Sequence, residues 1–106
     1  MDKKQAIEKV AEFIEAIKIK YHPQKVVLFG SYAKGTNNDN SDIDVAVIVD
    51  EITGDFLEET QGLYKIRRKI DLSIEPVLLE TKNDDSRFLE EILATGEVLY
   101  TVSYYR

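Results

Sequence analysis

The chain has 106 residues, no cysteine, and a formal net charge of −6 from 20 acidic and 14 basic residues. The lack of cysteine excludes disulfides, thiolate catalysis and cysteine-bound zinc, and no run approaches the ~18 apolar residues of a membrane-spanning helix. The acidic balance argues against a protein that tracks a long nucleic-acid strand, because such proteins carry a basic stripe. We therefore expect one soluble, cytoplasmic domain over residues 1–106 that binds no membrane.

The first part of the chain predicts a helix, a strand and a loop. Residues 3–20 carry apolar side chains at helical spacing, with Lys and Glu between them. Residues 25–29 form a short apolar run ending at Gly30, which is typical of a buried strand. Residues 31–41 are polar and predict a loop with one helical turn at its start.

The second part continues the alternation of strands and helices. Residues 43–49 are rich in β-branched side chains and give the clearest strand, and residues 54–68 predict an amphipathic helix. Residues 69–76 alternate between apolar and polar side chains and predict a third strand. A helix is predicted over 85–94, and a short strand or extended tail over 97–101. The pattern predicts an α/β or α+β fold, a small sheet with helices mainly on one face.

Three carboxylates fall where strands are predicted. Asp is depleted in strands, and a buried charge is costly unless it is paired or binds a metal. Asp42 and Asp44 are two residues apart, so both project from one face of their strand. Asp71 would join them if the two strands are neighbours, or would be a strand-end carboxylate paired with Lys69 or Arg68. Oxygen ligands without His or Cys are typical of a magnesium site.

The turn after the first strand has the character of a phosphate-binding loop. Gly30 allows the backbone to approach a ligand closely, and Ser31 supplies a hydroxyl group. Lys34 adds a cation three residues later, although it could equally be an exposed loop lysine. A phosphate loop beside metal-binding carboxylates is the equipment of phosphoryl or nucleotidyl transfer.

The two motifs together resemble a known family. The run 30–35 (GSYAKG) followed by 41–44 (SDID) is similar to the signature of the nucleotidyltransferase superfamily related to DNA polymerase beta, and most similar to its minimal nucleotidyltransferase group. The resemblance covers residues 25–75. One departure is Lys34, where the family often has Arg; lysine supplies the charge but not bidentate phosphate binding.

The resemblance implies a polymerase beta-like palm fold and a role for each motif residue. Asp42 and Asp44 would hold two magnesium ions, and Asp71 would complete the site of the ion that activates the attacking hydroxyl. Four residues would lie on the phosphate side of ATP: Gly30, Ser31, Lys34 and Ser41. Ser41 has a second interpretation, since it could simply cap the turn that positions Asp42.

The identity of the molecule that accepts the nucleotidyl group follows only from the resemblance. Minimal nucleotidyltransferases resemble antitoxins that transfer AMP from ATP to a tyrosine of a partner HEPN-domain ribonuclease toxin, releasing pyrophosphate. This implies a hetero-oligomer with the toxin, or a homodimer when the protein is alone. Two alternatives stay open: a non-catalytic module that neutralises its partner by contact, and a nucleotidyltransferase for a small hydroxylated molecule. If the chain were instead an unrelated acidic α/β domain, it would show no magnesium-dependent binding of nucleotide.

Overall fold

The computed structural model describes residues 1–83 and 87–103 of the chain. Helices and strands follow one another in the order α1 (Lys3–Tyr21), β1 (Lys25–Phe29), α2 (Ser31–Lys34), β2 (Ile43–Val49), α3 (Phe56–Arg67), β3 (Ile74–Glu80), α4 (Phe88–Thr95) and β4 (Glu97–Thr101). The helical turn predicted at the start of the polar loop is α2, and the segment left as strand or tail is the strand β4. The predicted start of the last helix, residue 85, lies outside the described residues.

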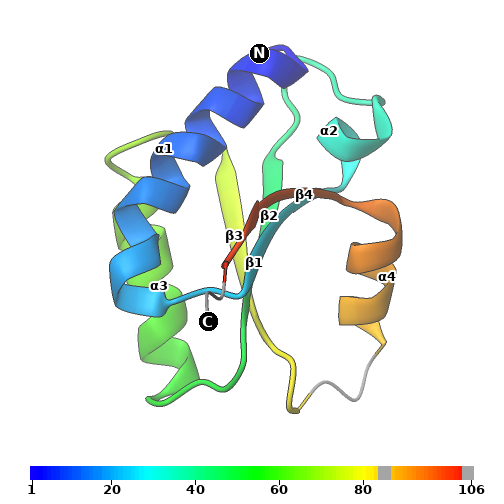
Figure 1. The fold of residues 1–106 in the computed structure, drawn as a ribbon. Coiled ribbons are helices and arrows are strands. Elements are labelled where there is room, and N and C mark those ends of the chain that lie inside the picture. The colour runs from blue at the N-terminus through cyan, green and yellow to red at the C-terminus, as the bar shows by residue number, and fades with distance from the viewer. Residues whose placement is uncertain (84–86, 104–106) are drawn as a thin grey trace.

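The four strands form one mixed sheet in the order β3-β2-β1-β4. β1 runs antiparallel to both β2 and β4, whereas β2 and β3 run parallel. Figure 1 shows α1 and α3 packed on one face of this sheet and α4 on the other. The predicted fold class, a small mixed sheet with helices mainly on one face, is therefore confirmed. Within the described part of the chain, no helix has the length and apolar character needed to cross a membrane.

The main core lies between the sheet and the helices α1 and α3. The α1 side chains that face it recur at helical spacing and include Val10, Phe13 and Ile17, each with no exposed surface. Leu28 and Val45 meet them from the sheet. Each such side chain contributes about 1.5–3 kcal/mol on burial, so this apolar packing holds the two helices on the sheet.

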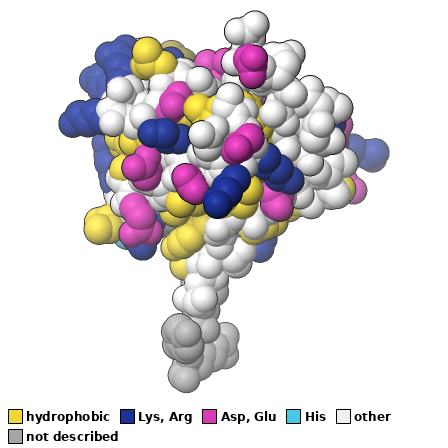
Figure 2. Space-filling view, turned by 90° about the horizontal axis from the view of Figure 1, so that it is seen from above, with side chains coloured by type: hydrophobic (Ala, Val, Ile, Leu, Met, Phe, Trp, Pro, Cys, Tyr) yellow, Lys and Arg dark blue, Asp and Glu magenta, His cyan; other side chains and the backbone are white. Residues whose placement is uncertain are grey.

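The opposite face of the sheet is only partly covered. A smaller apolar cluster joins Val27, Ala46 and Ile48 to Ile92 of α4. The end at which β2 and β3 begin carries polar side chains instead: Asp42 is exposed and Asp44 half-buried. Figure 2 looks down on this end, where acidic and basic side chains are intermixed. The end at which β2 and β3 begin is therefore the candidate location of a functional site.

The strand β3 begins later than the sequence predicts. The prediction was a strand over 69–76, but the strand spans Ile74–Glu80, and the preceding residues form turns. Pro76 suggested the end of a strand, yet it lies inside β3 opposite Val45. β3 is an edge strand, and an edge position tolerates proline because the missing N–H does not have to bond a second neighbour.

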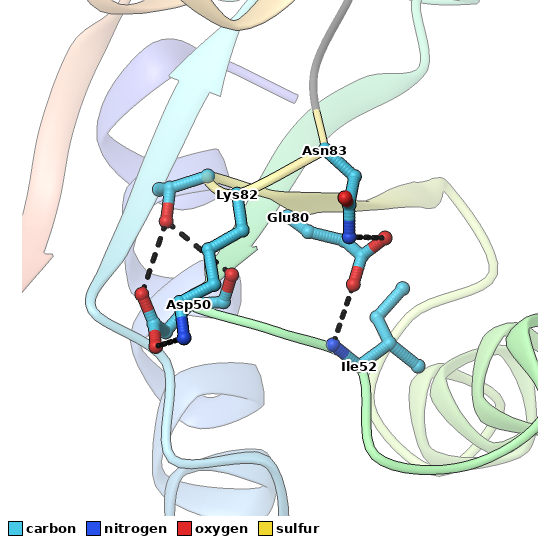
Figure 3. Close-up of polar contacts among 6 residues, drawn as sticks. Asp50, Ile52, Glu80, Lys82 and Asn83 are labelled. Carbon is cyan, nitrogen blue, oxygen red and sulfur yellow. Dashed lines mark hydrogen bonds and ion pairs between the residues drawn. The ribbon is translucent and has the colours of Figure 1, made fainter.

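The far ends of β2 and β3 are fastened by side chains (Figure 3). Glu80 accepts hydrogen bonds from the backbone N–H of Ile52 at 2.7 Å and from the Asn83 amide at 3.2 Å. Asp50 forms an ion pair with Lys82, with 3.3 Å between the nitrogen and the carboxylate oxygen. These contacts close the connections at the end of the sheet opposite Asp42 and Asp44.

Replacing Glu80 with Ala should lower stability without affecting the other end of the sheet. The Ile52 N–H is partly buried, and losing its charged acceptor costs about 1–3 kcal/mol. Urea denaturation measures this cost, with Glu51→Ala as the control because Glu51 is an exposed neighbouring carboxylate. Equal midpoints for the two variants would contradict a stabilising role for Glu80.

Candidate active site

Two carboxylates stand at the beginning of β2. Successive side chains of a strand alternate between faces, so Asp42 and Asp44 lie on the face that carries Ala46 and Ile48 further along. This is the partly covered face, beyond the reach of the apolar cluster under α4. The structure thus brings together the two aspartates that the sequence predicted as a pair.

Gly30 lies in direct contact with Asp44. The backbone of Gly30 has φ 73° and ψ −150°, a conformation essentially restricted to glycine. Phe29, at the end of β1, is the cross-strand partner of Asp44. A Cβ atom added at Gly30 would collide with the Asp44 carboxylate, lying 3.0 Å from its Cγ atom. The phosphate-loop candidate and the metal-ligand candidate are therefore in van der Waals contact.

The loop after Gly30 is shaped by its own backbone. The N–H of Lys34 donates to the carbonyl of Gly30 at 3.1 Å, and the N–H of Thr36 donates to that of Ser31 at 3.0 Å. Ser31 is half-buried, and its hydroxyl forms no hydrogen bond with another described residue. Lys34 is exposed and forms no ion pair with the part of the chain that the structure describes. Both polar groups are thus available to a ligand.

Ser41 shapes the loop that leads into β2. Its hydroxyl oxygen accepts a hydrogen bond from the Asn38 N–H at 2.8 Å, and its own N–H donates to the Asn38 carbonyl at 3.1 Å. This is the turn-capping role that the sequence left open. The same hydroxyl retains its proton as a donor, so a contact with phosphate is compatible with this geometry.

Asp71 does not lie in a strand, so the structural reason for including it in the site was wrong. It belongs to the turn before β3, where its Oδ1 atom accepts a hydrogen bond from the Ser73 N–H at 2.8 Å. Asp71 forms no ion pair with Lys69 or Arg68 in the described residues either. A short aspartate bonding the backbone two residues on is the usual way to build such a turn.

Glu75 is the carboxylate that the sequence did not select. In the parallel pair of β2 and β3, Glu75 lies directly opposite Asp44, so the two side chains are on the same face. Its Oε2 atom accepts a hydrogen bond from the Tyr64 hydroxyl at 3.0 Å. The available signal was the alternation around Ile74, which continues beyond Pro76 rather than ending there.

The carboxylates repel one another. Burial, followed by the charges of Asp42 and Glu75, raises the pKa of Asp44 above its usual value. Within residues 1–83 and 87–103, no three acidic or histidine side chains are close enough to hold a metal ion by themselves. Magnesium commonly binds through one or two carboxylates together with substrate phosphates. Asp42 and Asp44 fit that arrangement, because both offer oxygen ligands and because a cation would relieve the repulsion between the acidic side chains.

Comparisons with known proteins identify the family to which the chain belongs. A profile of the family described as "Polymerase beta, Nucleotidyltransferase" matches residues 8–104. A Methanocaldococcus jannaschii protein, provisionally named a protein adenylyltransferase, is 36% identical over 95 residues, covering 86% of this chain and 94% of that protein. Protein adenylyltransferase MntA of Shewanella oneidensis is 29% identical over 77 residues, covering 73% of this chain and 53% of its own length.

Solved structures show the same architecture. A Sulfolobus solfataricus protein, provisionally named a nucleotidyltransferase, aligns with a TM-score of 0.70 over 93% of this chain and 83% of that chain. At 17% identity this similarity concerns the fold alone. A solved toxin–antitoxin with AMP-PNP contains a chain with a TM-score of 0.59 and 26% identity, covering 91% of this chain and 73% of that one. The predicted family resemblance is confirmed.

Proposed function

The chain belongs to the polymerase beta nucleotidyltransferase family, and on that premise we propose that it is a magnesium-dependent protein adenylyltransferase that uses ATP. The observation that carries the proposal is the contact between two motifs far apart in sequence. The Asp42–Asp44 pair begins β2, and Gly30 of the candidate phosphate loop packs against the Asp44 carboxylate. A triphosphate bound at this loop would therefore lie beside the carboxylates that would share its magnesium ions.

The residues divide into two groups around the nucleotide. Asp42 and Asp44 would hold two magnesium ions, which supply stabilisation of the charge on the attacking and leaving oxygens when bound. The phosphate side would be lined by the loop and its flanking polar side chains, namely Gly30, Ser31, Lys34 and Ser41. The side chains of Ser31 and Lys34 support this assignment, because neither forms a hydrogen bond or ion pair with another described side chain or backbone group.

The third carboxylate is assigned to Glu75 instead of Asp71. Glu75 lies opposite Asp44 in the sheet, whereas Asp71 bonds the backbone of its own turn. In the proposed reaction, the acceptor hydroxyl attacks the α-phosphorus of ATP, a new oxygen–phosphorus bond forms, and pyrophosphate leaves. Glu75 would orient that hydroxyl or take up its proton.

The acceptor is proposed to be a tyrosine of a partner HEPN ribonuclease toxin, with this chain acting as its antitoxin in the cytoplasm. Support comes from the resemblance to MntA, which is named a protein adenylyltransferase, and to a chain of a toxin–antitoxin structure with AMP-PNP. The active form would be a hetero-oligomer with the toxin. Transfer to a small hydroxylated molecule and neutralisation by contact alone are the alternatives that the experiment below separates.

Incubation of the purified protein with its partner toxin, ATP and magnesium should add one or more adenylyl groups to the partner. Intact-mass spectrometry measures the addition, and peptide mapping identifies the modified residue. The increase should vanish in the Asp42→Asn/Asp44→Asn variant, because asparagine keeps the shape but not the charge that binds magnesium.

Two further variants separate the candidates for the third carboxylate. Glu75→Gln should lose most of the transfer, and Asp71→Asn should retain most of it, since asparagine can also accept the hydrogen bond from Ser73. The opposite ranking would return the role to Asp71. A stable complex with an unmodified partner would instead establish neutralisation by contact, and an untouched partner with modified small hydroxyl compounds would establish the other alternative.

A further inference from the structure

The hydroxyl of Tyr64 connects α3 with the candidate third carboxylate. It donates a hydrogen bond of 3.0 Å to Oε2 of Glu75, and both side chains are half-buried. Tyr64 comes from the helix that covers the other face of the sheet. Because β3 is the edge strand, a side chain of α3 can reach its outer side.

Tyr64 is itself held in place by Arg67. The guanidinium carbon of Arg67 lies 4.9 Å from the centre of the Tyr64 ring, which is the geometry of a cation–π contact. The same guanidinium group donates a hydrogen bond to the carbonyl of Leu72, in the turn that precedes β3. The tyrosine ring is therefore fixed between its own helix and the turn that leads into Glu75.

Only one oxygen of Glu75 is engaged by the protein. Its Oε2 accepts from Tyr64, and Oε1 has no hydrogen-bond or ion-pair partner in the described part of the chain. A carboxylate that is hydrogen-bonded through one oxygen presents the other in a restricted direction. Groups that hold metal ligands in this way commonly change metal affinity by ~10–100-fold when they are removed.

We propose that Tyr64 is a positioning residue that orients Glu75, so that its free oxygen serves the metal ion and the acceptor hydroxyl. This inference rests on the proposed function, since it takes Glu75 as the third carboxylate. It assigns to α3 a direct role in the site, beyond its packing in the core. The hydroxyl carries the effect, and the aromatic ring supports it through Arg67.

The Tyr64→Phe variant tests the inference, because it removes the hydroxyl but keeps the ring over which Arg67 lies. We expect Mn²⁺ binding in the presence of a non-hydrolysable ATP analogue, measured by electron paramagnetic resonance, to weaken by ~10–100-fold. Tyr21→Phe is the matched control, since its hydroxyl donates a comparable 2.9 Å bond to a backbone carbonyl, that of Glu59 in α3, rather than to a carboxylate of the site.

A double-mutant cycle with Glu75→Ala identifies the path of the effect. Adding Tyr64→Phe to Glu75→Ala should change Mn²⁺ affinity no further, because the hydroxyl would act only through Glu75. Equal affinity of the Tyr64→Phe and Tyr21→Phe proteins would overturn the inference while leaving the proposed function intact. If Mn²⁺ affinity were unaffected even by Asp42→Asn/Asp44→Asn, the proposed metal site would fail, and this inference with it.

Discussion

Without ligand, the Asp44→Asn protein should melt at a higher temperature than the wild type at pH 7, although it should lose adenylyl transfer by about 1,000-fold or more. The ionised Asp44 carboxylate is half-buried beside two other acidic side chains, Asp42 and Glu75. Asparagine has nearly the same shape but carries no charge, so it removes the repulsion together with the magnesium ligand. Thermal denaturation and a transfer assay with the partner toxin measure the two effects.

The dependence on pH follows from the direction of the pKa shift. Burial and the neighbouring charges raise the pKa of Asp44 in the folded protein, so the folded state binds this proton more tightly than the unfolded chain. Below the ordinary aspartate value of about 3.9, the group is protonated in both states and contributes no penalty. Stability is lost as the pH rises from there through the raised pKa. The advantage of Asp44→Asn should therefore grow from acid to neutral pH.

In the presence of magnesium and ATP, the wild type should melt at a higher temperature than the Asp44→Asn protein. A ligand present at 100 times its Kd stabilises the folded state by about 2.7 kcal/mol, and only the wild type would bind it well. Asp39→Asn is the control, since Asp39 is an exposed acidic residue of the loop before β2. If Asp44→Asn melted below both the wild type and Asp39→Asn without ligand, Asp44 would be a stabilising residue, contrary to this account.

Gly30→Ala should reduce adenylyl transfer by about 100-fold or more, because a displacement of about 1 Å at a reacting centre can have that effect. The alanine methyl group would meet the Asp44 carboxylate and push it from its place. The positive φ of 73° adds backbone strain, so a stability loss of about 1–3 kcal/mol is also expected. Steady-state kinetics and urea denaturation measure the two losses.

Gly35→Ala is the matched control for that variant. Gly35 also has a positive φ, 76°, but a Cβ atom there would meet no atom within 4 Å. With ψ 18°, Gly35 is in the left-handed helical region, so the variant adds a milder backbone strain without the collision. Gly35→Ala should lower stability while keeping most of the transfer rate. Similar activity losses in the two variants would show that loop strain, rather than the contact with Asp44, limits the reaction.

Much of this architecture was predictable because its signals are local. The β-branched run of β2 and the apolar run of β1 gave both strands at their observed bounds. The two-residue spacing of Asp42 and Asp44 was sufficient to place them on one face. Their contact with Gly30 was not predictable, since it depends on the cross-strand register that sets Phe29 opposite Asp44.

The strand that was predicted around Asp71 was misplaced for a physical reason. Alternation begins at Ile70, but the Leu72 side chain is 66% exposed and Asp71 bonds the turn, so the early part of the pattern does not form a strand. Whether a strand is central or at an edge is a property of the whole sheet, and only that knowledge makes Pro76 acceptable inside β3. Glu75 therefore became visible as a candidate only with the strand order.

The contact between Gly30 and Asp44 also restricts how the protein can recover from mutation. A side chain at position 30 would need a smaller residue at position 44, yet every smaller residue there lacks the carboxylate. No substitution at position 44 can therefore restore the activity that a side chain at position 30 removes. In a genetic selection, cells that carry the Gly30→Ala variant would regain the activity by true reversion to glycine. Second-site suppressors would have to act elsewhere in the sheet.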